Sequence, residues 1–209
     1  MKYIITVIRI LFLALFIFLI LKGKMMLWLA LFGVSLIVAL VFGRVYCGYI
    51  CPMNTVMIPV EGLSKKLRLQ KDQSPKWLRS GIFPWFALAG SIIFMVLTQK
   101  LLDLRIPILM IWLAVSVLVT LRYKPSVFHN LICPFGALLK VFGRSPIFSE
   151  KVNKQGCIGC KLCTKVCPSN AIEVKKEDKK SEIKTSLCLQ CTNCQQVCPK
   201  NTIHYSKQR

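Results

Sequence analysis

The chain has 209 residues, 55% of them hydrophobic, and a mean hydropathy of +0.56. It carries 29 Lys and Arg against 8 Asp and Glu, a formal net charge of +21. Such an apolar and basic chain is unusual among soluble globular proteins and predicts a membrane protein. The basic residues flank apolar segments and no nucleic-acid-binding motif accompanies them, which argues against nucleic acid as a partner.

Four apolar segments are predicted to cross a lipid bilayer as two helical hairpins. They cover residues 4–21, 25–42, 82–98 and 106–121. The first two are each about as long as a bilayer is thick. The last two have only 16 or 17 residues, which reach about 25 Å at 1.5 Å per residue. We therefore expect these helices to extend into residues 101–105 or to thin the bilayer locally.

Basic residues are distributed unevenly between the predicted loops. Seven lie in the central polar stretch, residues 44–80, and four lie in the two opposite loops. Cytoplasmic loops of membrane proteins carry an excess of Lys and Arg. The central loop, both termini and everything after Arg122 are therefore predicted to be cytoplasmic, in a protein that crosses the inner (cytoplasmic) membrane several times.

A short motif recurs after each predicted hairpin. Cys47-Gly-Tyr-Ile-Cys51-Pro52 matches His129-Asn-Leu-Ile-Cys133-Pro134, position by position. If the hairpins pack about a pseudo-two-fold axis, three thiolates and one imidazole could converge and hold a metal ion or an additional cluster. Two other readings remain open. Cys47 and Cys51 could be a redox-active thiol pair, or these cysteines could be structural with His129 as a cation at a helix end.

The remaining eight cysteines form two runs with the same spacing. Cys-x2-Cys-x2-Cys-x3-Cys-Pro begins at Cys157 and begins again at Cys188. This spacing is the signature of bacterial ferredoxins with two [4Fe-4S] clusters, in which the fourth cysteine of each run binds the other cluster. Structural zinc sites use separated pairs of ligands instead. One cluster is assigned to Cys157, Cys160, Cys163 and Cys198, and the other to Cys188, Cys191, Cys194 and Cys167.

The similarity between the two runs continues beyond the cysteines, which predicts a short strand after each cluster loop. Ile172 and Ile203 should face the clusters, while Glu173 and His204 alternate outward. The predicted fold is therefore a membrane α-helical domain, residues 1–148, followed by a small α+β ferredoxin-like domain, residues 149–209. So small a domain has little core of its own, and we expect its clusters to supply much of its stability.

These motifs resemble a family. The chain is similar over nearly its whole length to membrane-bound ferredoxin-type proteins of the NapH and MauN kind, which are related to the C-terminal part of NosR-type proteins. The resemblance implies four membrane helices, Cys-x3-Cys-Pro motifs and a two-cluster tail that carries electrons between a quinol pool or cytoplasmic donors and a partner reductase. The first motif matches at Cys47, Cys51 and Pro52. At the second, His129 stands where the family usually has cysteine.

The predicted function is that of a membrane-anchored electron-transfer subunit. Its expected partners are the subunits of a membrane-bound or soluble oxidoreductase, the lipid bilayer and, on the resemblance, quinone. No nucleotide-binding glycine loop, catalytic triad or haem-attachment motif occurs in the sequence, which argues against a stand-alone enzyme. The alternative is a metal-centre assembly or metal-reduction factor that uses the Cys47, Cys51, His129 and Cys133 site. A redox-sensing regulator is a third hypothesis.

Overall fold

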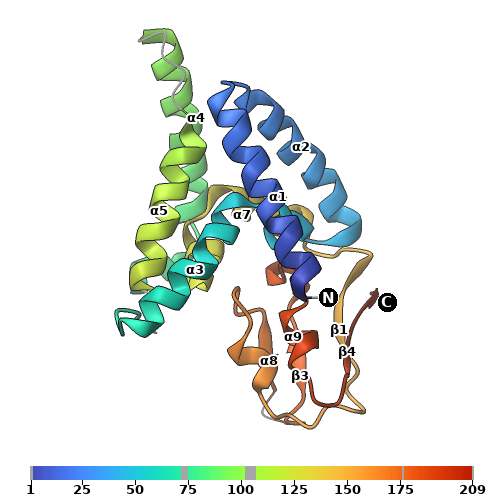
Figure 1. The fold of residues 1–209 in the computed structure, drawn as a ribbon. Coiled ribbons are helices and arrows are strands. Elements are labelled where there is room, and N and C mark those ends of the chain that lie inside the picture. The colour runs from blue at the N-terminus through green and yellow to red at the C-terminus, as the bar shows by residue number, and fades with distance from the viewer. Residues whose placement is uncertain (1, 72–74, 102–106, 176, 209) are drawn as a thin grey trace. The chain divides into compact units, whose positions relative to one another are not determined.

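The computed structural model describes residues 2–71, 75–101, 107–175 and 177–208 (Figure 1). It contains two compact units, each made of two stretches of chain. The first unit comprises Met1–Leu31 and Tyr49–Ala137, and the second comprises Phe32–Gly48 and Leu138–Arg209. The ferredoxin-like region therefore forms one body with the second half of an apolar helix and the turn after it.

Helices form at all four of the predicted apolar segments. They are α1 (Lys2–Leu21), α2 (Met25–Phe42), α4 (Phe83–Leu101) and α5 (Ile108–Arg122). In the described part of the chain, α1, α2 and α4 are long and apolar enough to cross a membrane. α5 has 15 residues, about 22 Å at the rise of an α-helix, which is short for a bilayer.

A bent pair of helices is a further candidate for a membrane span. It consists of Pro125–Ile132 and Pro134–Phe142, which meet at an angle of 73°. The structure thus has three candidate spans, or four if this pair counts as one, in the described residues. Helices therefore form at the four segments predicted to span the membrane. Their arrangement as two membrane-spanning hairpins stays a prediction.

Large apolar side chains are exposed along the candidate spans. Examples on three of the helices are Ile10, Leu11, Ile37, Phe86 and Ile93, all more than half exposed. Soluble proteins rarely expose apolar surface this extensively, whereas a lipid bilayer covers it at no cost. The exposure pattern agrees with the membrane protein that the composition predicts.

In the first unit, α3 (Pro52–Lys66) packs along α5. The Ser64 hydroxyl donates a hydrogen bond of 2.7 Å to the carbonyl oxygen of Leu121. After the helix ends, the Lys71 amide donates to the carbonyl oxygen of Arg122 at 2.8 Å. These bonds satisfy the backbone near the end of α5 and tie the Cys51-Pro52 helix to the second half of the chain.

The second unit contains two small antiparallel sheets. β1 (Phe148–Val152) pairs with β4 (Ile203–Lys207) (Figure 1). β2 (Ile172–Val174) pairs with β3 (Ser181–Ile183). The short helices α8 (Leu162–Lys165) and α9 (Asn193–Gln196) lie inside the two cysteine runs. The tail of the unit thus has two similar halves, as the repeated cysteine run predicts.

The core of this tail confirms the predicted strand faces. Ile172 and Ile203 are buried with Val152 and two of the cysteines, whereas Glu173 and His204 are exposed. Strand β1 was not predicted, since its five residues show no clear alternation in the sequence. It forms because β4 supplies its hydrogen-bonding partner, with Val152 opposite Ile203.

Candidate metal centres

The two cysteine loops share one backbone conformation. Three positions in the first loop region have a positive φ, and the matching position in the second loop region has a positive φ each time. The pairs are Gly159 with Gln190, Lys161 with Thr192, and Asn170 with Asn201. Left-handed backbone is uncommon outside glycine. Its recurrence at matched positions means that both loops make the same tight turns around their cysteines.

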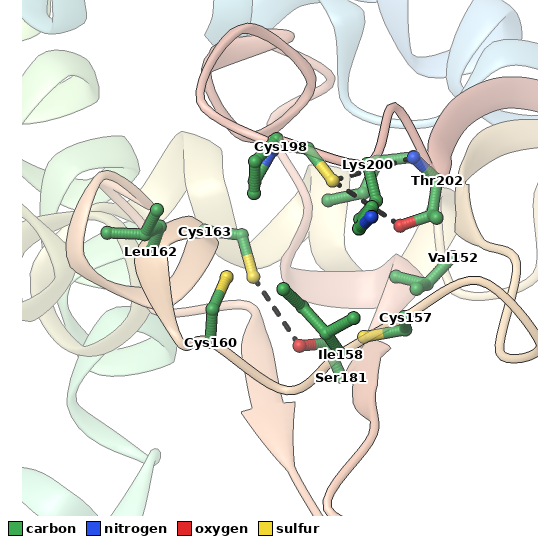
Figure 2. A pocket seen from close by; sticks show the side chains of 12 residues that line it. Val152, Cys157, Ile158, Cys160, Leu162, Cys163, Ser181, Cys198, Lys200 and Thr202 are labelled. Carbon is green, nitrogen blue, oxygen red and sulfur yellow. Dashed lines mark hydrogen bonds between the residues drawn. The ribbon is translucent and has the colours of Figure 1, made fainter.

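Four cysteines line a small cavity beside the first loop (Figure 2). Three come from one run, Cys157, Cys160 and Cys163, and the fourth is Cys198 from the other run. Hydroxyl groups accompany two of the sulfurs. Ser181 Oγ lies 3.5 Å from Cys163 Sγ, and Thr202 Oγ1 lies 3.3 Å from Cys198 Sγ (Figure 2).

The second loop forms a matching cavity. Its cysteines are Cys188, Cys191 and Cys194 from one run and Cys167 from the other. The Ala171 amide donates a hydrogen bond of 3.2 Å to Cys167 Sγ. Each cavity therefore brings together three cysteines of one run and the last cysteine of the other, which is the grouping that the spacing predicts.

The electrostatic surroundings of the thiols differ between the cavities. In the first, desolvation raises the pKa of Cys157, but hydrogen bonds from Ser181 and Gly159 outweigh it and leave the pKa below its usual value. In the second, burial raises the pKa of Cys188 and of Cys194 far above the usual range. These buried thiols can exist as thiolates only if a positive charge lies in the cavity, and iron supplies such a charge.

The donor set of each cavity fits an iron–sulfur cluster, because four cysteines line it and cysteine thiolates are the usual ligands of a [4Fe-4S] cluster. Each thiolate binds a different iron, so the four sulfurs surround the cluster. The apolar side chains of Val152 and Leu162 line the first cavity, and Ile172 lines the second. The residues present therefore fit a cluster in each cavity.

A buried polar network borders the second cavity. Glu150, 1% exposed, lines it from β1, and its Oε2 accepts a hydrogen bond of 2.8 Å from Gln195 Nε2. The Glu150 amide donates to Gln190 Oε1 at 3.1 Å, and Gln190 Nε2 donates to Ser149 Oγ at 2.7 Å. Burial raises the pKa of Glu150 above its usual value. Ser149 and Glu150 carry no signal in the sequence, since only the long-range pairing of β1 with β4 brings them to the cysteines.

Both Cys-Pro motifs have the same local structure. A π-helical turn, Tyr46–Ile50 or Phe128–Ile132, precedes the cysteine. Cys51 and Cys133 are then extended, with ψ of 118° and 116°, and a proline opens the next helix, α3 or α7 (Pro134–Phe142). Proline suits the first position of a helix, and π-helical turns are frequent at functional sites. The repeat of the Cys-Pro motif in the sequence is therefore also a repeat of local structure.

In the first unit, the second motif contacts the helix that follows the first motif. His129 is 3% exposed, and its Nε2 lies 3.1 Å from Oδ1 of the buried Asn54 on α3. Cys133 Sγ accepts a hydrogen bond of 3.3 Å from the Gly136 amide, in the first turn of α7. Asn54 was not predicted as a site residue, because its position corresponds to a glycine, Gly136, in the other repeat.

In the second unit, Cys47 lies beside a buried arginine. Arg44 is completely buried, and its Nη2 is 3.8 Å from Cys47 Sγ. The four residues of the predicted membrane-edge site are thus divided: Cys47 belongs to the second unit, and Cys51, His129 and Cys133 belong to the first. All four are buried.

Two family models match the chain. One describes a 4Fe-4S binding domain and matches residues 25–70 and 105–155, and the other describes a 4Fe-4S dicluster domain and matches residues 156–202. The first match includes both Cys-Pro motifs, and the second includes all eight cysteines of the two runs. The methylamine utilization ferredoxin-type protein MauN of Methylorubrum extorquens is 28% identical over 66% of the chain. The ferredoxin-type protein NapH of Haemophilus influenzae is 28% identical over 67%.

This chain is a ferredoxin-type 4Fe-4S protein of the NapH and MauN kind. The putative electron transport protein YccM of Escherichia coli is also similar, at 27% identity over 64% of the chain. The chain spans about half the length of these relatives: 53% of MauN, 54% of NapH and 44% of YccM. No solved structure matches it. The relation to NosR-type proteins stays a prediction.

The match to the two family models identifies 4Fe-4S ferredoxin domains in this chain. It does not extend to a third centre. The structure brings the eight tail cysteines into two groups of four, and it places His129 against Asn54. Whether Cys47, Cys51, His129 and Cys133 bind anything stays a prediction.

Proposed function

We propose that this NapH/MauN-type protein is a membrane-anchored subunit that relays single electrons between a soluble donor or the quinol pool and a partner oxidoreductase. Two [4Fe-4S] clusters would supply the one-electron chemistry, one in each cavity. Cys157, Cys160, Cys163 and Cys198 would hold the first, and Cys188, Cys191, Cys194 and Cys167 the second.

The observation that carries this proposal is the crossed grouping of the cysteines. Each cavity takes its fourth cysteine from the other run, so neither loop can bind its cluster without the other half of the tail. This exchange locks the two halves together and keeps their metal sites in one small core. Two neighbouring one-electron sites in a single core suit a relay.

The surrounding residues have three tasks in this function. The cysteine thiolates hold the iron, and the hydrogen bonds from Ser181, Thr202 and the Ala171 amide reduce the negative charge on sulfur. Ile172 and Ile203 exclude water from the space between the loops. None of these residues forms or breaks a bond in a substrate, so the chemistry on the final substrate belongs to a partner protein.

The apolar helices would hold this relay at the inner membrane. We place both termini and the tail on the cytoplasmic side, on the strength of the excess of basic residues in residues 44–80. In this orientation the tail meets soluble cytoplasmic donors, and the membrane part meets quinol.

Iron and sulfide quantification on anaerobically purified full-length protein tests the proposal. We expect about eight irons and eight sulfides per chain, with an EPR spectrum of two interacting [4Fe-4S] clusters after reduction. Cys160→Ser should lower the iron content, whereas Ser149→Ala, outside the ligand set, should not. A wild-type protein with one firmly bound metal ion per chain and no sulfide would refute the relay.

One observation favours a second candidate function, in metal-centre assembly or metal reduction. The hydrogen bond between His129 and Asn54 is buried and fixes the orientation of the imidazole ring, as such bonds do for metal ligands. Metal analysis of Cys47→Ser and His129→Ala separates the functions. An assembly factor should lose an exchangeable copper or iron in both variants. A relay with two clusters should keep about eight irons in both, and about twelve irons in the wild type would indicate a third cluster.

A further inference from the structure

Arg44 is a buried cation that the proposed relay does not yet use. It follows closely after the end of α2, and its side chain is completely inaccessible. Nη1 lies 3.4 Å from the carbonyl oxygen of Ser186, and Nε has no hydrogen-bond partner. No carboxylate in the described part of the chain forms an ion pair with it. A buried guanidinium of this kind requires a nearby negative charge.

The segment around Arg44 lies directly against the loop of the second cavity. Gly43 has a φ of +72°, and a Cβ there would come within 2.6 Å of Gln190 Nε2. A Cβ on Gly48 would overlap the carbonyl oxygen of Leu189 and lie 3.6 Å from the Cα atom of Cys191. The two glycines therefore permit a contact between the Cys47 turn and the cluster loop that side chains would prevent.

Aromatic contacts hold the end of α2 in this position. The ring of Phe42 stacks on Phe148 of β1 at 5.9 Å, and Phe148 stacks on Tyr205 of β4 at 6.5 Å. The Tyr205 hydroxyl donates a hydrogen bond of 3.1 Å to the carbonyl oxygen of Phe42. Because these contacts lie within one compact unit, the position of Arg44 beside residues 186–191 belongs to the fold of the tail.

The second cavity can supply the negative charge that this cation requires. Four thiolates and an oxidised [4Fe-4S] core carry about −2 in total, and reduction adds one more negative charge. Ser186, which contacts Arg44, shortly precedes the ligand Cys188 in the chain. Leu189, which contacts Gly48, lines the cavity itself. The buried guanidinium of Arg44 is separated from this cavity by the loop and not by bulk water, so its charge acts strongly on the cluster.

The first cavity faces different surroundings. Cys160 is exposed, and Ile158 and Leu162 on the same loop are 61% and 42% exposed. By contrast, Cys188, Cys191 and Cys194 of the second loop are all buried. The two cavities therefore differ in access to solvent, although their loops share one backbone conformation.

From these contacts we propose that Arg44 is a positioning residue that stabilises the reduced state of the cluster held by Cys167, Cys188, Cys191 and Cys194. This makes that cluster the end of the relay that adjoins the Cys47 turn, and it leaves the other cluster as the end open to carriers in solution. The inference rests on the proposed function, because it requires a cluster in each cavity. It adds no chemical step, since Arg44 contributes charge and position only.

Redox titration of the full-length holoprotein, followed by EPR, tests the role of Arg44. Arg44→Gln should shift the midpoint potential of one cluster to a lower value and leave the other unchanged, because the lost charge favoured the reduced state of one cluster only. Arg44→Lys, which keeps the charge, should restore most of that potential. A merely structural role would move both midpoints or neither, and either result would overturn the proposal.

A second variant assigns the shifted midpoint to a cavity. Ser181→Ala removes the hydroxyl beside Cys163, a ligand of the first cavity, and should lower the other midpoint. The double variant should lower both midpoints, each by the shift seen in the corresponding single variant. If Arg44→Gln and Ser181→Ala move the same midpoint, Arg44 does not act on the second cavity and the inference is wrong.

If the Arg44→Gln protein loses its clusters, glycine variants test the same contact between the Cys47 turn and the second loop. Gly48→Ala displaces the Leu189 backbone and should shift the same midpoint as the arginine variant. Gly62→Ala is the matched control, since a Cβ at Gly62 meets nothing within 4 Å. An unchanged midpoint potential in Gly48→Ala would refute the effect of this contact on the cluster.

Iron content separates a failure of this inference from a failure of the proposed function. A wild-type protein without two clusters refutes the relay. A wild-type protein with two clusters, whose midpoint potentials do not respond to these variants, refutes only the role of Arg44.

Discussion

Glu150 is the residue whose charge state the fold constrains most clearly. Burial raises its pKa, against smaller lowering effects from the hydrogen bond of Gln195 and the charge of His204. A cluster in the second cavity would add negative charge and raise this pKa further. The carboxyl group is therefore more easily protonated in the folded state than in the unfolded chain.

The sign of the pH dependence follows from this shift. A raised carboxyl pKa means that the folded state binds the proton more tightly, so stability is highest below the unfolded pKa and falls as pH rises through the folded pKa. Glu150→Gln replaces the carboxyl group with a neutral amide and so removes this loss of stability at high pH. We expect the variant to be more stable than wild type at pH 8, by about 1 kcal/mol, with the difference vanishing near pH 4.

Anaerobic thermal unfolding of the holoprotein, followed through cluster absorbance at both pH values, measures the effect of Glu150→Gln. The control is Glu173→Gln, whose carboxylate is exposed and pairs with Lys184 at the surface. Exposed pairs contribute little to stability. Equal effects of the two variants, or a destabilised Glu150→Gln at pH 8, would contradict the prediction.

Single residues differ in how far the sequence identifies them. The eight tail cysteines, Ile172 and Ile203 follow from spacing and alternation, since both patterns are local and repeated. Glu150, Asn54 and Arg44 have no such pattern. They reach their sites through pairings between distant segments, such as β1 with β4, which local sequence does not encode.

At the scale of elements, the cluster loops depend on their left-handed turns. Gly159 has a φ of +68°, and a Cβ there would overlap the carbonyl oxygen of Lys179. Gly159→Ala should therefore destabilise the first loop by about 1–3 kcal/mol. Its iron content after mild heating should fall below that of wild type.

The matched position in the second loop supplies the control for Gly159→Ala. Gln190, which occupies that position, already has a side chain at a φ of 57°. Gln190→Gly should relax this turn, although it removes the hydrogen bonds to β1. Because the strain in Gly159→Ala lies in the first loop, EPR should show that this variant loses the first cluster alone. Loss of the second cluster in that variant would show that the turn at Gly159 acts on the whole core.

The π-helical turns are elements that the sequence did not predict. Each motif was expected at a helix end, and the structure inserts a wider turn before each cysteine. Such a turn depends on the packing of the segment rather than on residue propensity. For the second motif that packing includes the hydrogen bond between His129 and Asn54.

Asn54→Ala tests the contribution of this hydrogen bond. The substitution leaves a buried imidazole nitrogen without its partner, which should cost about 1–3 kcal/mol. We expect a lower thermal midpoint for the membrane part, with the EPR signals of the tail unchanged. Thr55→Ala is the control, since the Thr55 hydroxyl bonds to the backbone at the start of its own helix, at Cys51. An Asn54→Ala protein as stable as Thr55→Ala would contradict a structural role for the bond.

At the scale of the whole molecule, the number of membrane spans decides on which side the two ends lie. An even number puts both termini on one side, and an odd number separates them. Composition predicts four spans, while the described residues contain three helices that are long and apolar enough, together with the short α5 and the bent pair Pro125–Ile132 and Pro134–Phe142. The sequence located the helices correctly because long apolar runs dominate local structure. How a helix as short as α5 meets a bilayer depends on its packing against neighbouring helices, which local sequence does not encode.

Reporter fusions determine this number. The excess of basic residues predicts cytoplasmic termini, so a fluorescent protein that folds only in the cytoplasm should be bright at either end. Alkaline phosphatase, active only outside the cytoplasm, should be active when inserted after Gly23, where the turn is open and a Cβ would meet nothing within 4 Å. Three spans would leave the C-terminal fluorescent fusion dark and the N-terminal one bright. Four spans make both bright, and then the clusters, the Cys47 turn and both Cys-Pro motifs share the cytoplasmic side, as a relay from a soluble donor requires.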